Sequence, residues 1–92
     1  MNQTKPNAIL LDPSDNVVTV TASVSCGDPV IFSRDGQMNE IIAAEAVPVF
    51  HKMAICDLSK GAAVIKYGEV IGKATMDIRT GAHVHIHNLS DE

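Results

Sequence analysis

Aromatic side chains are scarce in this sequence: Phe32, Phe50 and Tyr67 are the three present, and there is no tryptophan. The interior must therefore be built from Val, Ile, Leu, Ala and Met, which make up most of the 46% of residues that are hydrophobic. A chain of 92 residues forms one domain at most. Because so small a domain buries a modest fraction of its surface, we expect a partner surface to stabilise it.

Runs of Lys or Arg are also missing, and the formal net charge is -4. Binding to nucleic acid requires a positive surface opposite the phosphates, and attachment to an anionic membrane requires a polybasic patch. The sequence therefore argues against both kinds of partner. A small acidic substrate would need a local group of basic residues, because the overall charge does not attract it.

Cysteine occurs twice, as Cys26 and Cys56, without CxxC spacing. Two such cysteines do not make a disulfide framework, and we interpret both as buried thiols in a reducing compartment. Residues 1–8 contain no charged segment followed by a long apolar run, and no stretch has the length and hydrophobicity of a membrane span. We therefore expect a cytoplasmic location.

The most regular pattern in the sequence has a period of two. From Val17 to Val24, apolar residues alternate with Thr and Ser, which predicts a strand with one buried face. The turn signal Asp35-Gly36 between residues 29–32 and 40–43 predicts a hairpin. No segment has a long helical stripe. Further strands are expected at 48–56, 64–67 and 82–88, with a tight turn at Gly68-Glu69.

A turn pattern, apolar-x-x-Gly-x-x-Val, occurs three times, at 24–30, 58–64 and 78–84. Glycine suits the closing position because it adopts positive φ without steric cost. We interpret the pattern as a recurring turn and not as a repeat architecture. Many short strands joined by glycine turns predict an all-β fold, either a small barrel or a folded-over set of hairpins with short helical turns.

Three of the four histidines, His83, His85 and His87, lie within five residues. On a regular strand their side chains share one face, while Val84 and Ile86 point into the core. Three imidazoles at this spacing can approach one metal ion, and zinc or ferrous iron accepts neutral imidazole nitrogen. An anion site is the alternative, because imidazole N–H groups also bind carboxylates. The alternative without a functional role is an exposed polar strand face that happens to contain histidines.

Two further segments carry residues suited to chemistry. His51 and Lys52 are adjacent, so both reach one site only if His51 lies at the beginning of its strand. Lys66 could hold a carboxylate as a point charge, although a solvated lysine beside a hairpin is the simpler explanation. Gly72 stands where another backbone or a ligand can come close. No Ser-His-Asp arrangement, Walker loop or dinucleotide fingerprint is present.

These motifs, in this order, resemble the SAF-type domain of the altronate and galactarate dehydratase family. The resemblance covers nearly the whole chain after residue 10, and it implies a small β-clip domain at 11–92 after a flexible N-terminus at 1–10. It rests on His51-Lys52-x-Ala54, Gly61, Ile65-Lys66-Tyr67-Gly68-Glu69-x-Ile71-Gly72-x-Ala74-Thr75, Asp77-Ile78-x-x-Gly81 and Val84-His85-x-His87-Asn88.

The resemblance implies the small subunit of a two-subunit carbon-oxygen lyase, which dehydrates a sugar acid to a keto-deoxy acid and is inactive without its large subunit. It equally allows the alpha subunit of (2R)-sulfolactate sulfo-lyase, which releases sulfite and pyruvate. A sugar-acid- or metal-binding module without turnover is the alternative from a different class. A structural role in pilus or flagellar assembly, where SAF-type domains also occur, would normally bring an export signal.

Matched to the family's motifs, the sequence implies catalytic roles for His51, Lys52 and His85, substrate binding by Lys66, Tyr67 and Asn88, and metal binding by His85, His87 and, less firmly, His83. His83 stands where family members vary, and Phe50 where glycine is common. The implied cofactor is a divalent metal, Fe2+ in particular, supplied largely by the large subunit. The implied partners are that subunit and a small acidic substrate, and the chain could also form a homo-oligomer.

Overall fold

The computed structural model describes residues 5–90, and none of them is helical. The all-β class is thereby confirmed, and hydrogen-bonded turns stand where short helical turns were expected. No helix in the described part of the chain is long and apolar enough to cross a membrane. The strands are β1 Ala8–Ile9, β2 Val17–Val20, β3 Pro29–Arg34, β4 Gln37–Ile42, β5 Lys52–Ala54, β6 Ala63–Lys66, β7 Glu69–Ala74, β8 His83–Val84 and β9 Leu89–Ser90.

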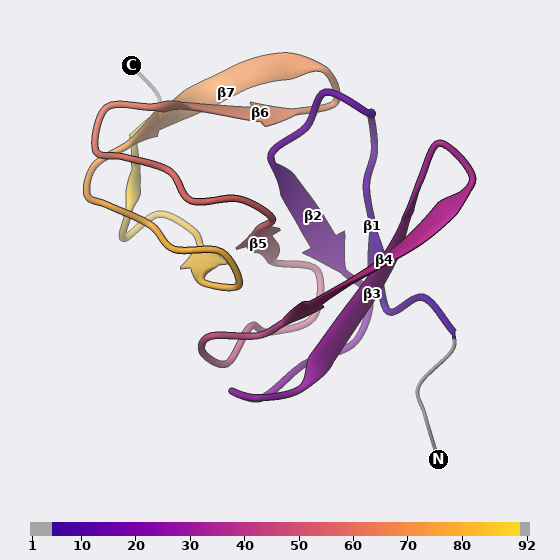
Figure 1. Ribbon diagram of the computed structural model, residues 1–92. Coiled ribbons are helices and arrows are strands. Elements are labelled where there is room, and N and C mark those ends of the chain that lie inside the picture. The colour runs from indigo at the N-terminus through magenta and orange to yellow at the C-terminus, as the bar shows by residue number, and fades with distance from the viewer. Residues whose placement is uncertain (1–4, 91–92) are drawn as a thin grey trace.

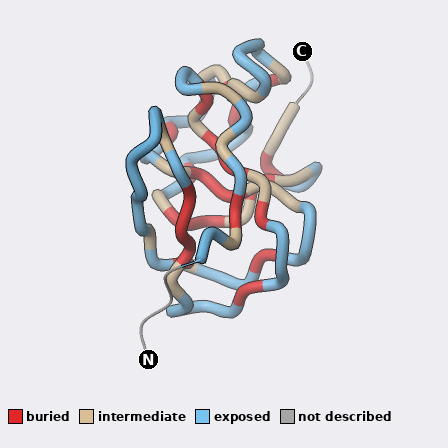
Figure 2. Tube along the Cα trace, turned by 90° about the vertical axis from the view of Figure 1, so that its right-hand side faces the viewer, coloured by how far each residue is buried: buried red, intermediate tan, exposed pale blue. Residues whose placement is uncertain are grey.

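A central antiparallel sheet in the order β1-β2-β5-β8 lies between two hairpins. The β3–β4 hairpin covers one side, and the β6–β7 hairpin, extended by β9, covers the other (Figure 1). Because successive side chains of a strand point to opposite faces, β2 directs Val18 and Val20 into one core and Val17 into the other. The central strands are therefore buried on both faces, as the red segments of Figure 2 show.

The recurring turn is present in four copies, one more than the sequence pattern indicated. The residue that closes each turn has positive φ, and the fourth copy, at 47–53, is closed by Phe50 (φ 68°) in place of glycine. Each closing N–H donates to a carbonyl of a neighbouring segment: Gly27 to Ala43, Phe50 to Val20, Gly61 to Ala74 and Gly81 to Ala54. Isolated bridges join the turns in two pairs, Val24 with Val47 and Leu58 with Ile78.

Several predicted strand boundaries are wrong. The strand expected over 17–24 ends at Val20, and the strand expected over 48–56 is limited to β5, because the flanking residues form these turns. The strand expected over 82–88 stops at Val84, and Ile86, expected in the core, is 84% exposed. The hairpin after β6 turns at Tyr67-Gly68, both with positive φ, and not at Gly68-Glu69.

The N-terminal segment and the cysteines also differ from expectation. Within the segment expected to be flexible, 1–10, Ala8 and Ile9 pair with β2 as strand β1; residues 1–4 of that prediction lie outside the described residues. Cys26 and Cys56 are free but exposed, so the expectation that they are buried is wrong. Both lie in turn segments between strands, where side chains face solvent.

Candidate functional site

The candidate site begins where β5 and β8 meet at one edge of the central sheet. In this antiparallel pair Met53 lies opposite His83 and Lys52 opposite Val84. His51 directly precedes β5, so it stands at the beginning of its strand, as required for sharing a site with Lys52. Continuing the register by one position places His51 opposite His85, and their rings stack with centroids 4.0 Å apart.

Three histidines bring their ring nitrogens together at this edge. Nδ1 of His51 lies 2.8 Å from Nε2 of His83, so one of the two nitrogens donates and the other accepts. One ligand atom from each of His51, His83 and His85 lies within 4.8 Å of the others. Nδ1 of His85 is buried and has no hydrogen-bond partner in the described part of the chain. Imidazole nitrogens that converge in this way fit a divalent transition metal.

A turn at residues 85–88 carries the C-terminal part of the cluster. Asn88 is 4% exposed. Its Oδ1 accepts from the backbone N–H of His85 at 2.9 Å, and its Nδ2 donates to the carbonyl of His83 at 2.8 Å. The backbone N–H of Asn88 also donates to the carbonyl of His85 at 3.1 Å. The amide therefore closes the turn and ties it to the end of β8, which fixes the backbone at both His83 and His85.

The electrostatic surroundings favour neutral imidazoles. Burial lowers the pKa of His83, and repulsion from the charged forms of His51, His87 and His85 lowers it further, while attraction to the Glu45 carboxylate opposes the shift. Burial also lowers the pKa of His85, with repulsion from His51 and Lys52 as the next causes. A neutral ring nitrogen offers a lone pair, which is the form that a metal ligand requires.

Lys52 and Lys66 add positive charge beside the histidines. Lys52 is half-buried, and this burial, followed by repulsion from Lys66, lowers its pKa. Nζ of Lys66 lies 5.3 Å from the centre of the Tyr67 ring, within cation–π range. Thr19 lies opposite Lys52 across β2 and β5, and its buried hydroxyl has no hydrogen-bond partner in the described part of the chain. An anionic group would meet two ammonium groups here.

The comparison with protein families decides the assignment. A family model described as the altronate/galactarate dehydratase SAF domain matches residues 6–92. This chain belongs to that family. The resemblance inferred from the ordered motifs is therefore confirmed.

Relatives of this SAF domain include enzymes of both expected kinds. Altronate dehydratase of Escherichia coli is 45% identical over 74 residues, which cover 80% of this chain and 14% of that protein. The (2R)-sulfolactate sulfo-lyase subunit alpha of Chromohalobacter salexigens is 49% identical over 45 residues, 49% of this chain and 48% of that one. Its counterpart in Paracoccus pantotrophus is 40% identical over 58 residues, 63% of this chain and 87% of that one. The matched part of this SAF domain thus spans a small part of the dehydratase and about half of the first sulfo-lyase subunit.

The structure brings some of the expected site residues together and separates others. The ring nitrogens of His51, His83 and His85 converge. Lys52 lies close enough to His85 for its charge to lower the pKa of that imidazole. The His87 ring lies beside that of His83, with centroids 5.2 Å apart, but His87 is not among the three whose ligand atoms converge. Among the remaining residues, Lys66 lies near Lys52, Tyr67 is 65% exposed on the hairpin turn, and Asn88 faces inward.

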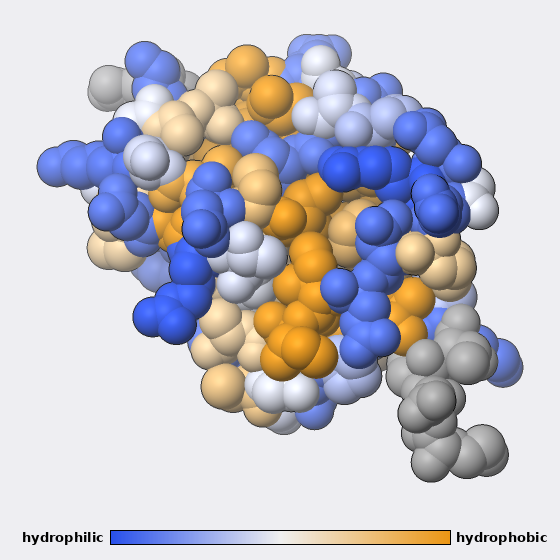
Figure 3. All heavy atoms as spheres, viewed as in Figure 1, coloured by the Kyte–Doolittle hydropathy of each residue, from blue (hydrophilic) through white to orange (hydrophobic). Residues whose placement is uncertain are grey.

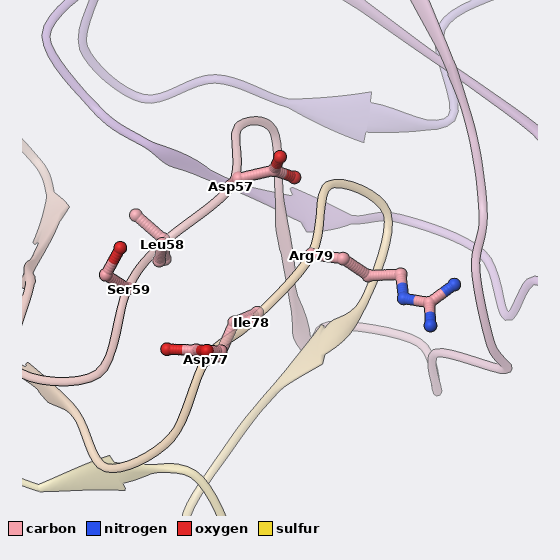
Figure 4. A pocket seen from close by; sticks show the side chains of 6 residues that line it. All are labelled: Asp57, Leu58, Ser59, Asp77, Ile78 and Arg79. Carbon is pink, nitrogen blue, oxygen red and sulfur yellow. The ribbon is translucent and has the colours of Figure 1, made fainter.

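A separate pocket of about 400 Å³ lies at the bridge between Leu58 and Ile78 (Figure 4). Its two carboxylates are occupied in closing turns: Asp57 accepts from the N–H and hydroxyl of Thr80, and Asp77 accepts from the N–H of Lys60. None of the histidines lines it. We assign these carboxylates a structural role in the SAF fold.

Apolar surface accompanies the histidines. Phe50, next to His51, is 71% exposed, and Ile86, between His85 and His87, is 84% exposed. Figure 3 shows further apolar side chains gathered across the middle of the face seen in Figure 1, with hydrophilic ones around them. Exposed apolar side chains beside a polar site are typical of a surface that another protein covers.

Proposed function

We propose that this SAF domain is the small subunit of a two-subunit carbon-oxygen lyase that dehydrates a sugar acid to a keto-deoxy acid. The observation that carries the proposal is the group of cationic and imidazole side chains, His51, His85 and Lys52 with Lys66, gathered at one place in a chain of net charge -4. The identity to altronate dehydratase supports the reaction class, and the relatives named subunit alpha support a separate subunit.

Two lysines of this chain have separate roles in the proposed reaction. Lys66 binds the substrate carboxylate as a point charge. Lys52, whose pKa is lowered by burial, takes the proton α to the carboxylate. The β-hydroxyl leaves with a proton as water, and the resulting enol becomes the keto acid. A divalent metal facing His51 and His85 would supply Lewis-acid polarisation, and the large subunit would close the site over it.

The large subunit covers the apolar surface around Phe50 and Ile86 in this proposal. Exclusion of water there would strengthen every interaction between the charged side chains and the substrate. The SAF domain is inactive alone in this proposal, because in its described residues the converging ligand atoms come from three histidines and include no carboxylate that could complete a catalytic site. The complex acts in the cytoplasm, where Cys26 and Cys56 remain reduced.

The alpha subunit of (2R)-sulfolactate sulfo-lyase is the second candidate, since two relatives bear that name and one of them is matched over 87% of its length. The two functions share proton abstraction and differ in the leaving group, water or sulfite. The contacts that distinguish the leaving groups would lie on the large subunit.

Co-expression with a candidate large subunit tests the proposal. With a tag on this chain alone, the purified complex is supplied with ferrous iron and offered altronate, galactarate and (2R)-sulfolactate. Keto-acid release from a sugar acid is the expected result, and sulfite release would select the second candidate. A chain that elutes alone and turns over nothing would indicate a binding module.

Variants of the complex test the roles of the residues. His85→Ala should lower turnover by about 100-fold or more while leaving the circular dichroism of the isolated domain unchanged. Lys52→Ala should lower turnover to a similar extent. Its matched control is Lys60→Ala, because Lys60 is exposed and lies outside the cluster, so turnover should not change. Normal turnover in His85→Ala would remove the histidine cluster from the mechanism.

A further inference from the structure

We propose that this domain by itself binds a divalent transition-metal ion through His51, His83 and His85, without His87 and without ligands from another subunit. The proposal goes beyond the lyase function, because it assigns the ion to this chain and names the ligand set. The linear pattern His83-x-His85-x-His87 suggests a different ligand set. That set omits His51, which is 32 residues from His83 in the sequence.

The distances between the nitrogens carry the proposal. A metal ion bonded to imidazoles at about 2.0–2.1 Å in a tetrahedral site keeps their nitrogens roughly 3.3 Å apart. Nδ1 of His51 and Nε2 of His83 are 2.8 Å apart, and all three ligand atoms lie within 4.8 Å of one another. Small changes in the side-chain torsion angles therefore bring the three lone pairs onto one ion, in place of the proton that His51 and His83 share.

The backbone already holds the ligands in position. His51 and His83 are anchored by the register of β5 and β8, and His85 by the hydrogen bond from its N–H to Asn88. Nδ1 of His85 is buried without a partner in the described part of the chain, a state that costs free energy until a proton donor or a metal occupies it. His87 is exposed within the turn at residues 85–88.

The ligand chemistry selects the class of metal. Three neutral imidazoles, with no carboxylate or thiolate converging on them from residues 5–90, suit Zn2+, Co2+, Ni2+ and Fe2+ and are poor ligands for Mg2+ and Ca2+. Three protein ligands leave at least one coordination position open for water or for an oxygen of an anionic ligand. Lys52 and Lys66 lie nearby, so such a ligand would be anionic.

Titration of the full 92-residue chain with Co2+, without partner or substrate, tests the proposal. We expect one equivalent to bind and to produce the visible absorption of cobalt with nitrogen ligands. His51→Ala should weaken metal binding by roughly 100-fold or more. Loss of a residue that only orients a metal ligand can already cost that much, and His51 is proposed as a ligand itself. His87→Ala is the matched control and should change the affinity by less than about threefold. The reverse ranking of these two variants would overturn the proposal in favour of the linear motif.

A second measurement does not depend on the variants folding. Zn2+ is added to the wild-type chain, and the ring nitrogens of all four histidines are followed by ¹⁵N NMR. Shifts at His51, His83 and His85, with His87 unchanged, are expected. Absence of binding by either metal would overturn the proposal. Both readouts omit the large subunit, so a lyase whose small subunit binds no metal would contradict this inference and leave the proposed function intact.

Discussion

The buried amide of Asn88 determines how His83, in strand β8, and His85, in the turn that follows, are presented. It is 4% exposed, and both of its polar atoms are used inside the turn, one with His85 and the other with His83. A residue expected to contact the substrate therefore has its hydrogen-bonding groups directed toward the backbone. We infer that Asn88 acts on the site by positioning the histidines.

Substitution Asn88→Ala should destabilise the domain by about 2–4 kcal/mol, because it leaves the part-buried N–H of His85 and carbonyl of His83 without the partners that Asn88 provides. Urea denaturation of the isolated chain measures the change. Asn39→Ala is the control: Asn39 is exposed and donates to the nearby carbonyl of Gln37, so its loss should cost less than about 0.5 kcal/mol. Equal effects at the two positions would show that the amide of Asn88 does not hold the turn.

The four turns show how the surroundings of a glycine decide its importance. Gly61 and Gly81 both have φ of 90°, a conformation that other residues adopt only with strain. A Cβ at Gly61 would meet nothing within 4 Å, whereas one at Gly81 would lie 2.4 Å from the carbonyl oxygen of Ile42. Two turns of the same shape therefore differ in how closely the rest of the chain packs on them.

Gly61→Ala should cost about 1–2 kcal/mol from backbone strain alone. Gly81→Ala should lower the free energy of unfolding by about 3–5 kcal/mol, because the backbone at Ile42 must also move away from the new Cβ. Thermal unfolding of the two variants side by side measures the difference. If both lose the same stability, the close approach at Gly81 does not contribute.

The hairpins were predictable because their information is local. Asp35-Gly36 has positive φ at both positions, which matches the twist of two-residue hairpins, and it follows a short apolar run. Gly72 was predicted to allow a close approach, and a Cβ there would lie 2.0 Å from the carbonyl oxygen of Ser90. The fourth turn was missed because its φ of 68° is adopted by Phe50, a residue that rarely takes this conformation.

The histidine site was only partly predictable. Alternation placed Val84 in the core and the histidines on one face, but it continued a strand through Ile86, where side-chain hydrogen bonds from Asn88 impose a turn instead. The meeting of His51 with His83 depends on the pairing of β5 with β8, which joins residues far apart in the sequence. No local pattern carries that information.

The stability of the whole domain should fall below neutral pH because of the histidines. His83 has a lowered pKa in the folded chain, while in the unfolded chain it titrates near its usual value of about 6.5. Between the two values the unfolded chain binds more protons, so the free energy of unfolding decreases as the pH falls from about 6.5 and levels off below the folded-state pKa.

Urea denaturation between pH 8 and 5 measures this dependence, and His83→Gln should make it shallower. The carboxylates act in a different range: hydrogen bonds from Thr80 lower the pKa of Asp57, so its effect begins only below about pH 4. A stability that is constant from pH 8 to 5 would contradict the role given to burial of His83.

Strand β8 is two residues long and lies at the edge of the central sheet, paired there with β5. Short edge strands open locally at a small fraction of the free energy of global unfolding. Each opening would separate His83 from His51 and withdraw Val84 from the second core, while the first core stays closed. The rate at which a molecule bound between the histidines enters and leaves would then be limited by fraying of β8, and amide hydrogen exchange at Val84 would report that rate.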